Sequence, residues 1–166
     1  AALHIAYLAF GLKKGDTLWT SPNTFVATSN AALYCGAKVD FVDIDPKTYC
    51  LSISNLEQKL YIAAKNGELP TAIVPVHFAG QSCEMSRVHE LSQQYGFKVV
   101  EDASHAIGGE YNKNKIGNCE FSDASVFSFH PVKIVTTGEG GMVVTNSVEL
   151  YEKLVLLRSH GITREV

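Results

Sequence analysis

Short, almost continuously apolar runs alternate along the chain with segments whose apolar residues recur at helical spacing. The apolar runs are rich in β-branched residues, and such runs are typical of strands that are buried on both faces. The expected strands cover residues 17–20, 39–44, 71–76, 97–102, 124–129 and 141–146. The expected helices cover residues 1–10, 25–35, 54–64, 86–95 and 147–158.

Glycine and serine residues mark several of the expected helix ends. Gly11, Gly36 and Gly96 each follow a helical segment, where glycine adopts the left-handed conformation that closes a helix. Ser54 is followed three residues later by Glu57, a spacing that predicts a capping box at the start of the third helix.

The alternation of strands and helices predicts an α/β fold, with a mostly parallel sheet and helices on both faces. No linker or repeat divides residues 1–166, so we expect one domain. In such sheets, ligands bind beyond the carboxyl ends of the strands. The polar clusters that follow the strands should therefore converge; they are Pro22–Phe25, His77–Gly80, Glu101–His105 and Ser128–Lys133.

Composition narrows the possible classes of protein. The 166 residues are 46% hydrophobic and 19% charged, which favours a packed core over disorder. The net charge of −3 gives no basic excess for nucleic-acid binding. No apolar run is long enough to cross a membrane, and the apolar start lacks the leading positive charge of a signal peptide. Four irregularly spaced cysteines predict neither a zinc site nor a disulfide framework, but reduced thiols in a cytoplasmic protein.

Two ionisable residues at strand ends are the strongest candidates for chemistry. Asp102 ends an apolar strand, where a buried carboxylate needs a cation or several hydrogen-bond donors. The alternative is that Asp102 is the N-cap of the segment 103–107. Lys133 has apolar neighbours and precedes the sequence TTGEGG. A lysine held in an apolar site has a lowered pKa, as a Schiff-base lysine requires. The alternative is that Lys133 is an ordinary surface lysine.

Three further residues extend this pattern. His105 lies three residues after Asp102 and would share its side of a helical segment, or it is a structural histidine. Ser128 could bind a phosphate near Lys133. Phe25 could stack on a planar ring or belong to the core. An aspartate, a lysine, a serine and an aromatic residue around one sheet edge match the chemistry of pyridoxal 5′-phosphate (PLP).

Three segments resemble the DegT/DnrJ/EryC1/StrS family of sugar aminotransferases, which are fold-type I PLP enzymes. They are EDASHAIGG (101–109), SFHPVKIVTTGEGGMVVTN (128–146) and SPNTFVATSNAALYCGAKVDFVDID (21–45). The resemblance covers essentially the whole chain, and the SFHPVK–TTGEGG pattern is highly specific. It implies that residues 1–166 are part of the PLP-binding large domain, without its N-terminal segment and without the C-terminal small domain.

The resemblance also implies roles for individual residues. Lys133 matches the lysine that forms the Schiff base, and Asp102 matches the aspartate at the pyridine nitrogen. His105 matches the position beside the ring hydroxyl. The related dehydratases have histidine in place of the lysine, so the presence of Lys133 favours transamination.

The remaining cofactor contacts implied by the resemblance surround the phosphate and the ring face. Ser128 matches the phosphate-binding serine, and Phe25 matches the aromatic residue that stacks on the ring. The phosphate-binding turn of the family would lie just before Ala1, so the backbone at Ala1 and Ala2 would be its remaining part.

The segments HFAGQSCEM (77–85) and LLRSHGITRE (156–165) are most similar to family members of the pseudaminic acid pathway. This implies transfer of an amino group from L-glutamate to C4 of a UDP-linked 4-keto-6-deoxy-N-acetylhexosamine, in a homodimer. Arg158 and His160 would lie near the dimer interface or the substrate, or at the solvated end of a helix. The alternatives are another nucleotide-sugar aminotransferase of the family and a non-catalytic binding or regulatory module. A nucleotide-binding domain is disfavoured because GxGxxG is absent.

Overall fold

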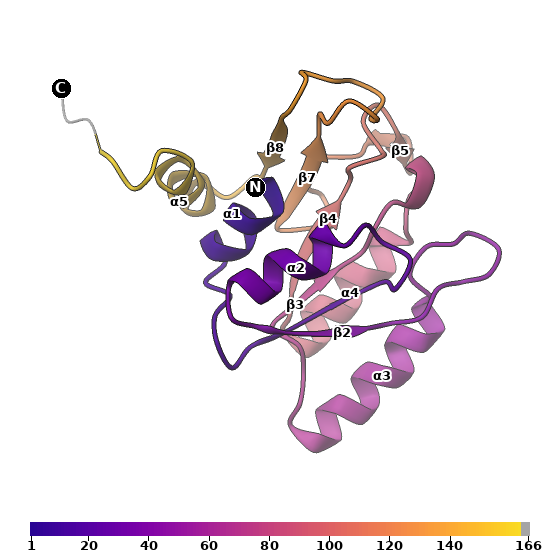
Figure 1. The fold of residues 1–166 in the computed structure, drawn as a ribbon. Helices are drawn as coiled ribbons and strands as arrows, with labels where there is room; N and C mark the ends of the chain where they lie inside the picture. The colour runs from indigo at the N-terminus through magenta and orange to yellow at the C-terminus, as the bar shows by residue number, and fades with distance from the viewer. Residues whose placement is uncertain (164–166) are drawn as a thin grey trace.

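A computed structural model describes residues 1–163 and shows a six-stranded sheet with helices on both faces (Figure 1). The strand order is β2-β1-β3-β4-β7-β8, and only β8 runs antiparallel to its neighbour. The predicted mostly parallel α/β fold is confirmed. The strands are β1 (Thr17–Thr20), β2 (Lys38–Phe41), β3 (Ala72–Val74), β4 (Lys98–Asp102), β7 (Ala124–Ser128) and β8 (Gly141–Val144).

Five α-helices connect and cover the strands, as the sequence pattern predicted. They are α1 (Ala2–Ala9), α2 (Ala27–Tyr34), α3 (Ile53–Asn66), α4 (Met85–Tyr95) and α5 (Val148–Arg158), with a short 3₁₀ helix η1 (Phe78–Gly80). Gly11, Gly36 and Gly96 all have a positive φ just beyond a helix. The expected capping box of α3 is wrong. Ser52, not Ser54, caps this helix, because the Ser52 hydroxyl accepts a hydrogen bond from the Asn55 N–H at 3.3 Å.

The side chains of β4 alternate between two separate cores. Val99 packs with residues of α3 and α4, whereas Val100 packs with residues of α1 and α2 on the other face of the sheet. The same alternation continues to the end of the strand. Glu101 therefore faces the α3 and α4 side, and Asp102 faces the α1 and α2 side, so two adjacent carboxylates enter different environments.

A two-stranded hairpin follows β4 and was not expected from the sequence. It pairs β5 (Glu110–Tyr111) with β6 (Asn114–Lys115). The two turn residues, Asn112 and Lys113, both have a positive φ, as a tight hairpin turn requires. The turn lacks the glycine that usually marks this geometry, so the hairpin has no clear signal in the sequence.

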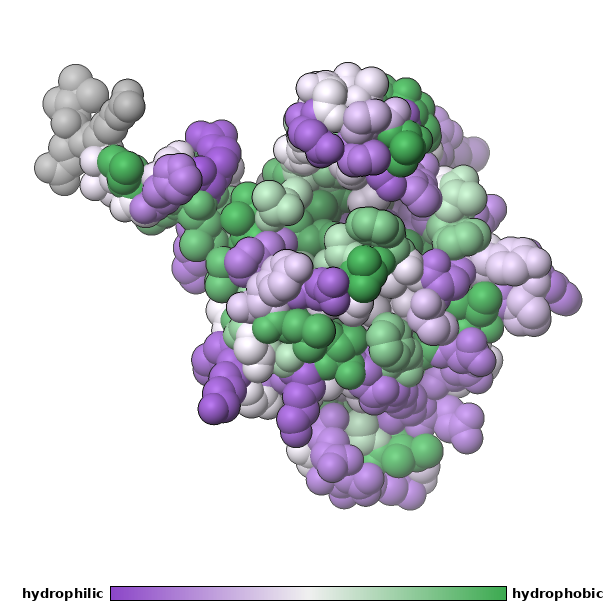
Figure 2. Space-filling view, in the orientation of Figure 1, coloured by the Kyte–Doolittle hydropathy of each residue, from purple (hydrophilic) through white to green (hydrophobic). Residues whose placement is uncertain are grey.

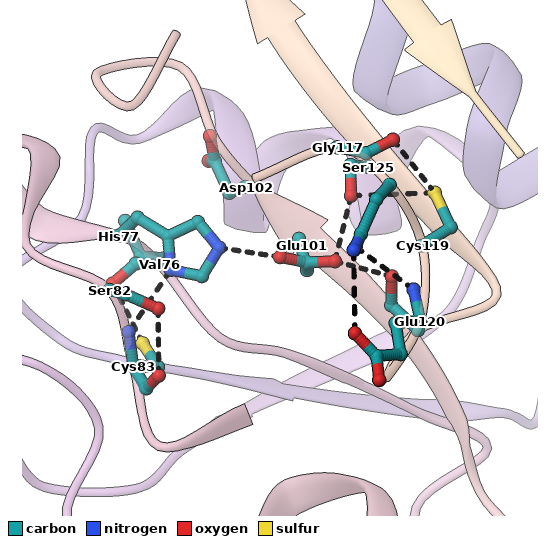
Figure 3. A network of polar contacts seen from close by, with 12 residues as sticks. Val76, His77, Ser82, Cys83, Glu101, Asp102, Gly117, Cys119, Glu120 and Ser125 are labelled. Atoms are coloured by element: carbon teal, nitrogen blue, oxygen red, sulfur yellow. Dashed lines mark hydrogen bonds and ion pairs between the residues drawn. The ribbon is translucent and has the colours of Figure 1, made fainter. Parts of the chain in front are cut away.

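Glu101 belongs to a buried polar network on the α3 and α4 side of the sheet (Figure 3). Its Oε2 lies 2.7 Å from Nε2 of the fully buried His77, and Ser122 and Ser125 donate to its Oε1. The backbone N–H of Cys83 donates to His77 Nδ1, so His77 Nε2 carries the proton that Glu101 accepts. Burial alone would raise the pKa of Glu101, but these hydrogen bonds hold it below its usual value.

This network makes stability sensitive to acid. The folded-state pKa of Glu101 lies below its unfolded value, so its stabilisation is complete above about pH 4.3 and is lost as the pH falls through the folded-state pKa. We expect Glu101→Gln to lower the free energy of unfolding at pH 7 by about 1–3 kcal/mol and to flatten its decline in acid. Denaturant titrations from pH 7 to pH 3 measure both effects. The exposed control Glu68→Gln should keep the wild-type pH slope, and a wild-type slope in Glu101→Gln would contradict the assignment.

Candidate active site

A cleft of about 870 Å³ lies at the carboxyl ends of the parallel strands. Its volume lies within the range of small-molecule binding sites. Residues from all four polar clusters contribute to its wall, which confirms that these clusters converge. The predicted site residues that line the cleft are Ala2, Phe25, Asp102, His105, Ser128 and Lys133.

Apolar side chains surround much of this cleft. Figure 2 shows hydrophobic residues interspersed with polar ones over the part of this face where α1 and α2 lie. Phe25, Val26, Tyr34 and Val132 line the cleft and are exposed. An apolar wall with a few polar groups suits a ligand that has both a ring and charged substituents.

Asp102 is a buried carboxylate in the wall of the cleft, with 4% of its surface exposed. Thr28 donates to Oδ2 at 2.6 Å. Ser104 donates to Oδ1 from its hydroxyl at 2.6 Å and from its backbone N–H at 3.2 Å. Three donors thus compensate for the burial of the carboxylate. Residues 103–107 form turns, so the alternative that Asp102 caps a helix is wrong.

Lys133 reaches His105 across the cleft. It lies in the loop between β7 and β8, where its backbone N–H closes a turn on the His130 carbonyl. Lys133 Nζ lies 2.8 Å from His105 Nε2. Burial and the charge of Lys133 lower the pKa of His105, while Asp102 acts in the opposite direction. The imidazole is therefore neutral at neutral pH, and its Nε2 can accept a hydrogen bond from the lysine amine.

Ser128 lies beside the start of α1. It is the register partner of Gly141 in the β7–β8 pair, and a Cβ at Gly141 would come within 2.9 Å of the Ala2 Cβ. The close approach of β8 to α1 therefore requires glycine at position 141. This contact brings Ser128 near the first turn of α1, and the backbone N–H groups of a first helical turn can bind an anion.

Phe25 lies at the rim of the cleft rather than in the core. Its side chain is 73% exposed, so the alternative that it is a core residue is wrong. It lies between Thr24 and Thr28, whose hydroxyls are 2.7 Å apart. Neither threonine was singled out from the sequence, because Thr24 lies before α2 and the fold of this loop brings its hydroxyl to Thr28.

The comparison with known protein families is decisive. The sequence profile of the DegT/DnrJ/EryC1/StrS aminotransferase family matches residues 1–166. The chain belongs to this family.

Similar proteins of the DegT/DnrJ/EryC1/StrS family include named enzymes. The UDP-4-amino-4,6-dideoxy-N-acetyl-β-L-altrosamine transaminase of Campylobacter jejuni (serotype O:23/36, strain 81-176) is 47% identical over 99% of this chain and 42% of its own length. The solved structure of Helicobacter pylori PseC, an aminotransferase involved in the biosynthesis of pseudoaminic acid, matches with a TM-score of 0.89 and 39% identity over 99% of this chain and 43% of its own. NtdA of Bacillus subtilis, solved with bound PMP, matches with a TM-score of 0.80 and 30% identity over 93% of this chain and 33% of its own.

The chain spans about 42% of the length of the Campylobacter relative, so it corresponds to part of that protein.

Within residues 1–163, no helix combines the length and apolar character needed to cross a membrane. The same residues contain no group of three or more His, Cys, Asp or Glu side chains placed to hold a metal ion. Arg158 and His160 do not line the cleft, and residues 164–165 of the LLRSHGITRE segment lie outside the described residues.

Proposed function

We propose that the full-length protein is a PLP-dependent aminotransferase and that residues 1–166 form part of its cofactor-binding large domain. Its amino donor is L-glutamate, and its acceptor is a UDP-linked 4-keto-6-deoxy-N-acetylhexosamine. The product is UDP-4-amino-4,6-dideoxy-N-acetyl-β-L-altrosamine, and the enzyme acts as a cytoplasmic homodimer. The observation that carries the proposal is the presence of Asp102 and Lys133 in one cleft of a chain that matches this aminotransferase family.

The residues around the cleft fit PLP group by group. Asp102 offers a buried carboxylate to the ring nitrogen, and Lys133 offers an amine to the aldehyde. Ser128 and the backbone N–H groups of the first turn of α1, which begins at Ala2, offer hydrogen bonds to the phosphate. The exposed ring of Phe25 offers a flat apolar surface to the pyridine ring.

PLP, when bound, supplies an aldehyde that condenses with amines and a ring that withdraws electrons from the adjacent carbon. Asp102 would hold a proton at the ring nitrogen, because its charge favours the protonated ring. Lys133 Nζ would hold the cofactor through its aldehyde carbon. When the lysine is released, its free amine would take the proton from Cα of glutamate. The neutral His105 ring would accept a hydrogen bond from this amine and keep it directed into the cleft.

The test uses the full-length protein with PLP, L-glutamate and a UDP-linked 4-keto-6-deoxy-N-acetyl sugar. We expect 2-oxoglutarate and a 4-amino sugar in equal amounts, with the product identified by mass spectrometry and NMR. Turnover only with another nucleotide sugar, such as a GDP-linked one, would contradict the proposed identity of the acceptor. Cofactor binding without transamination of any 4-keto sugar would instead support the non-catalytic module.

A further inference from the structure

Two threonine hydroxyls form a hydrogen-bonded chain that ends on Asp102. Thr24 Oγ1 lies 2.7 Å from Thr28 Oγ1, and Thr28 Oγ1 lies 2.6 Å from Asp102 Oδ2. Thr28 is fully buried, and it is separated from Asp102 by 74 positions in the sequence. The contact therefore joins α2 to the carboxyl end of β4.

The direction of this chain follows from the number of protons. A threonine hydroxyl has one proton to donate, and a carboxylate only accepts. Thr28 uses its proton on Asp102, so the bond between the two threonines must be donated by Thr24. The hydroxyl of Thr28 is thus fixed in rotation, with one acceptor and one donor.

The backbone of Thr28 is fixed as well. Tyr7 of α1 donates its hydroxyl to the Thr28 carbonyl at 3.1 Å. Burial, together with the charge of Asp102, raises the pKa of Tyr7, so the phenol keeps its proton and remains a donor. Helices α1 and α2 and strand β4 therefore meet at Thr28, three residues after the ring of Phe25.

We propose that Thr28 is a positioning residue whose hydroxyl sets the orientation of the Asp102 carboxylate toward the pyridine nitrogen of the cofactor. This proposal rests on the proposed function. The Thr28 backbone N–H also donates to the Phe25 carbonyl at 3.1 Å, so the backbone of Phe25 is tied to the residue that contacts the carboxylate. The cofactor would meet a carboxylate whose orientation at the edge of its ring is set before it binds.

The competing explanation is that Thr28 only fills space between α2 and β4. The two explanations predict opposite results for two substitutions at Thr28. Thr28→Val keeps the shape and loses the hydroxyl, whereas Thr28→Ser keeps the hydroxyl and loses a methyl group. A positioning role requires valine to be the damaging change, and a space-filling role requires serine to be the damaging change.

The experiment measures PLP affinity of the full-length variants by absorbance titration, and the ¹⁵N NMR shift of a ¹⁵N-labelled pyridine nitrogen. We expect Thr28→Val to weaken PLP binding by about 10- to 100-fold, as for the loss of a hydrogen bond to a charged group, and to move the ¹⁵N signal. Thr28→Ser should remain close to wild type in both. Thr24→Val, which removes only the first donor, should weaken binding by about fivefold and keeps the test valid if Thr28→Val does not fold.

Thr20→Val is the matched control, because Thr20 is also a fully buried threonine but donates its hydroxyl to the Val74 carbonyl. It should lower the unfolding temperature without moving the ¹⁵N signal. Wild-type affinity and an unmoved signal in Thr28→Val, or greater damage in Thr28→Ser, would overturn the positioning role alone. A wild-type protein that does not bind PLP would overturn the proposed function and the positioning role together.

Discussion

Replacing Lys133 with alanine in the full-length protein is expected to abolish transamination and the absorbance band of covalently bound PLP. The amine of Lys133 lies in the cleft beside the neutral ring of His105, and alanine leaves no group there that can hold the aldehyde or move the Cα proton. Loss of both roles should reduce the turnover rate by at least about 10⁴-fold. Absorbance spectra and a glutamate-dependent assay measure the two effects.

Borohydride reduction gives an independent test of the same residue. Reduction of the PLP-loaded wild-type protein should attach the cofactor to the peptide that contains Lys133, as detected by mass spectrometry. The Lys133→Ala protein should carry no label, and the exposed control Lys47→Ala should behave like wild type. An unchanged spectrum or an unchanged labelling level in Lys133→Ala would remove this lysine from its proposed role.

The layered fold was predictable because burial on both faces leaves a direct trace in the sequence. The side chains around Val99 and Val100 enter opposite cores, so both positions must be apolar, and the strand appears as a continuous apolar run. The location of the site was predictable for a related reason. A polar residue such as Asp102 at the end of such a run lies at the sheet edge where clefts form, whatever its partners are.

The partners of these residues were not predictable from local pattern. Asp102 meets Thr28 across 74 positions, and nothing near Thr28 distinguishes it from any other threonine in a helix. Ser52 and Ser54 are both suitable caps, and the backbone conformation at Ser52 decides between them. Local sequence reports on burial and conformation, whereas hydrogen-bond partners depend on how distant elements pack.

Asp102→Asn is expected to retain weak PLP binding and to lose most of the turnover. Asparagine has nearly the same shape, but it carries no charge to hold a proton at the ring nitrogen. Its amide must also place an NH₂ group against Thr28 or Ser104, both of which donate to the carboxylate in the native protein. The misplaced amide should weaken PLP binding, and the missing charge should reduce the turnover rate of the loaded enzyme by about 10²–10³-fold.

Measuring the turnover rate at saturating PLP separates these two effects of Asp102→Asn. Asp43→Asn, which changes an exposed carboxylate after β2, controls for the loss of one negative charge from the molecule. If the charge acts at the ring nitrogen, excess PLP should restore cofactor occupancy in Asp102→Asn but not its activity. Recovery of near-normal turnover would mean that Asp102 only organises the hydrogen bonds of Thr28 and Ser104, and that another group controls the ring proton.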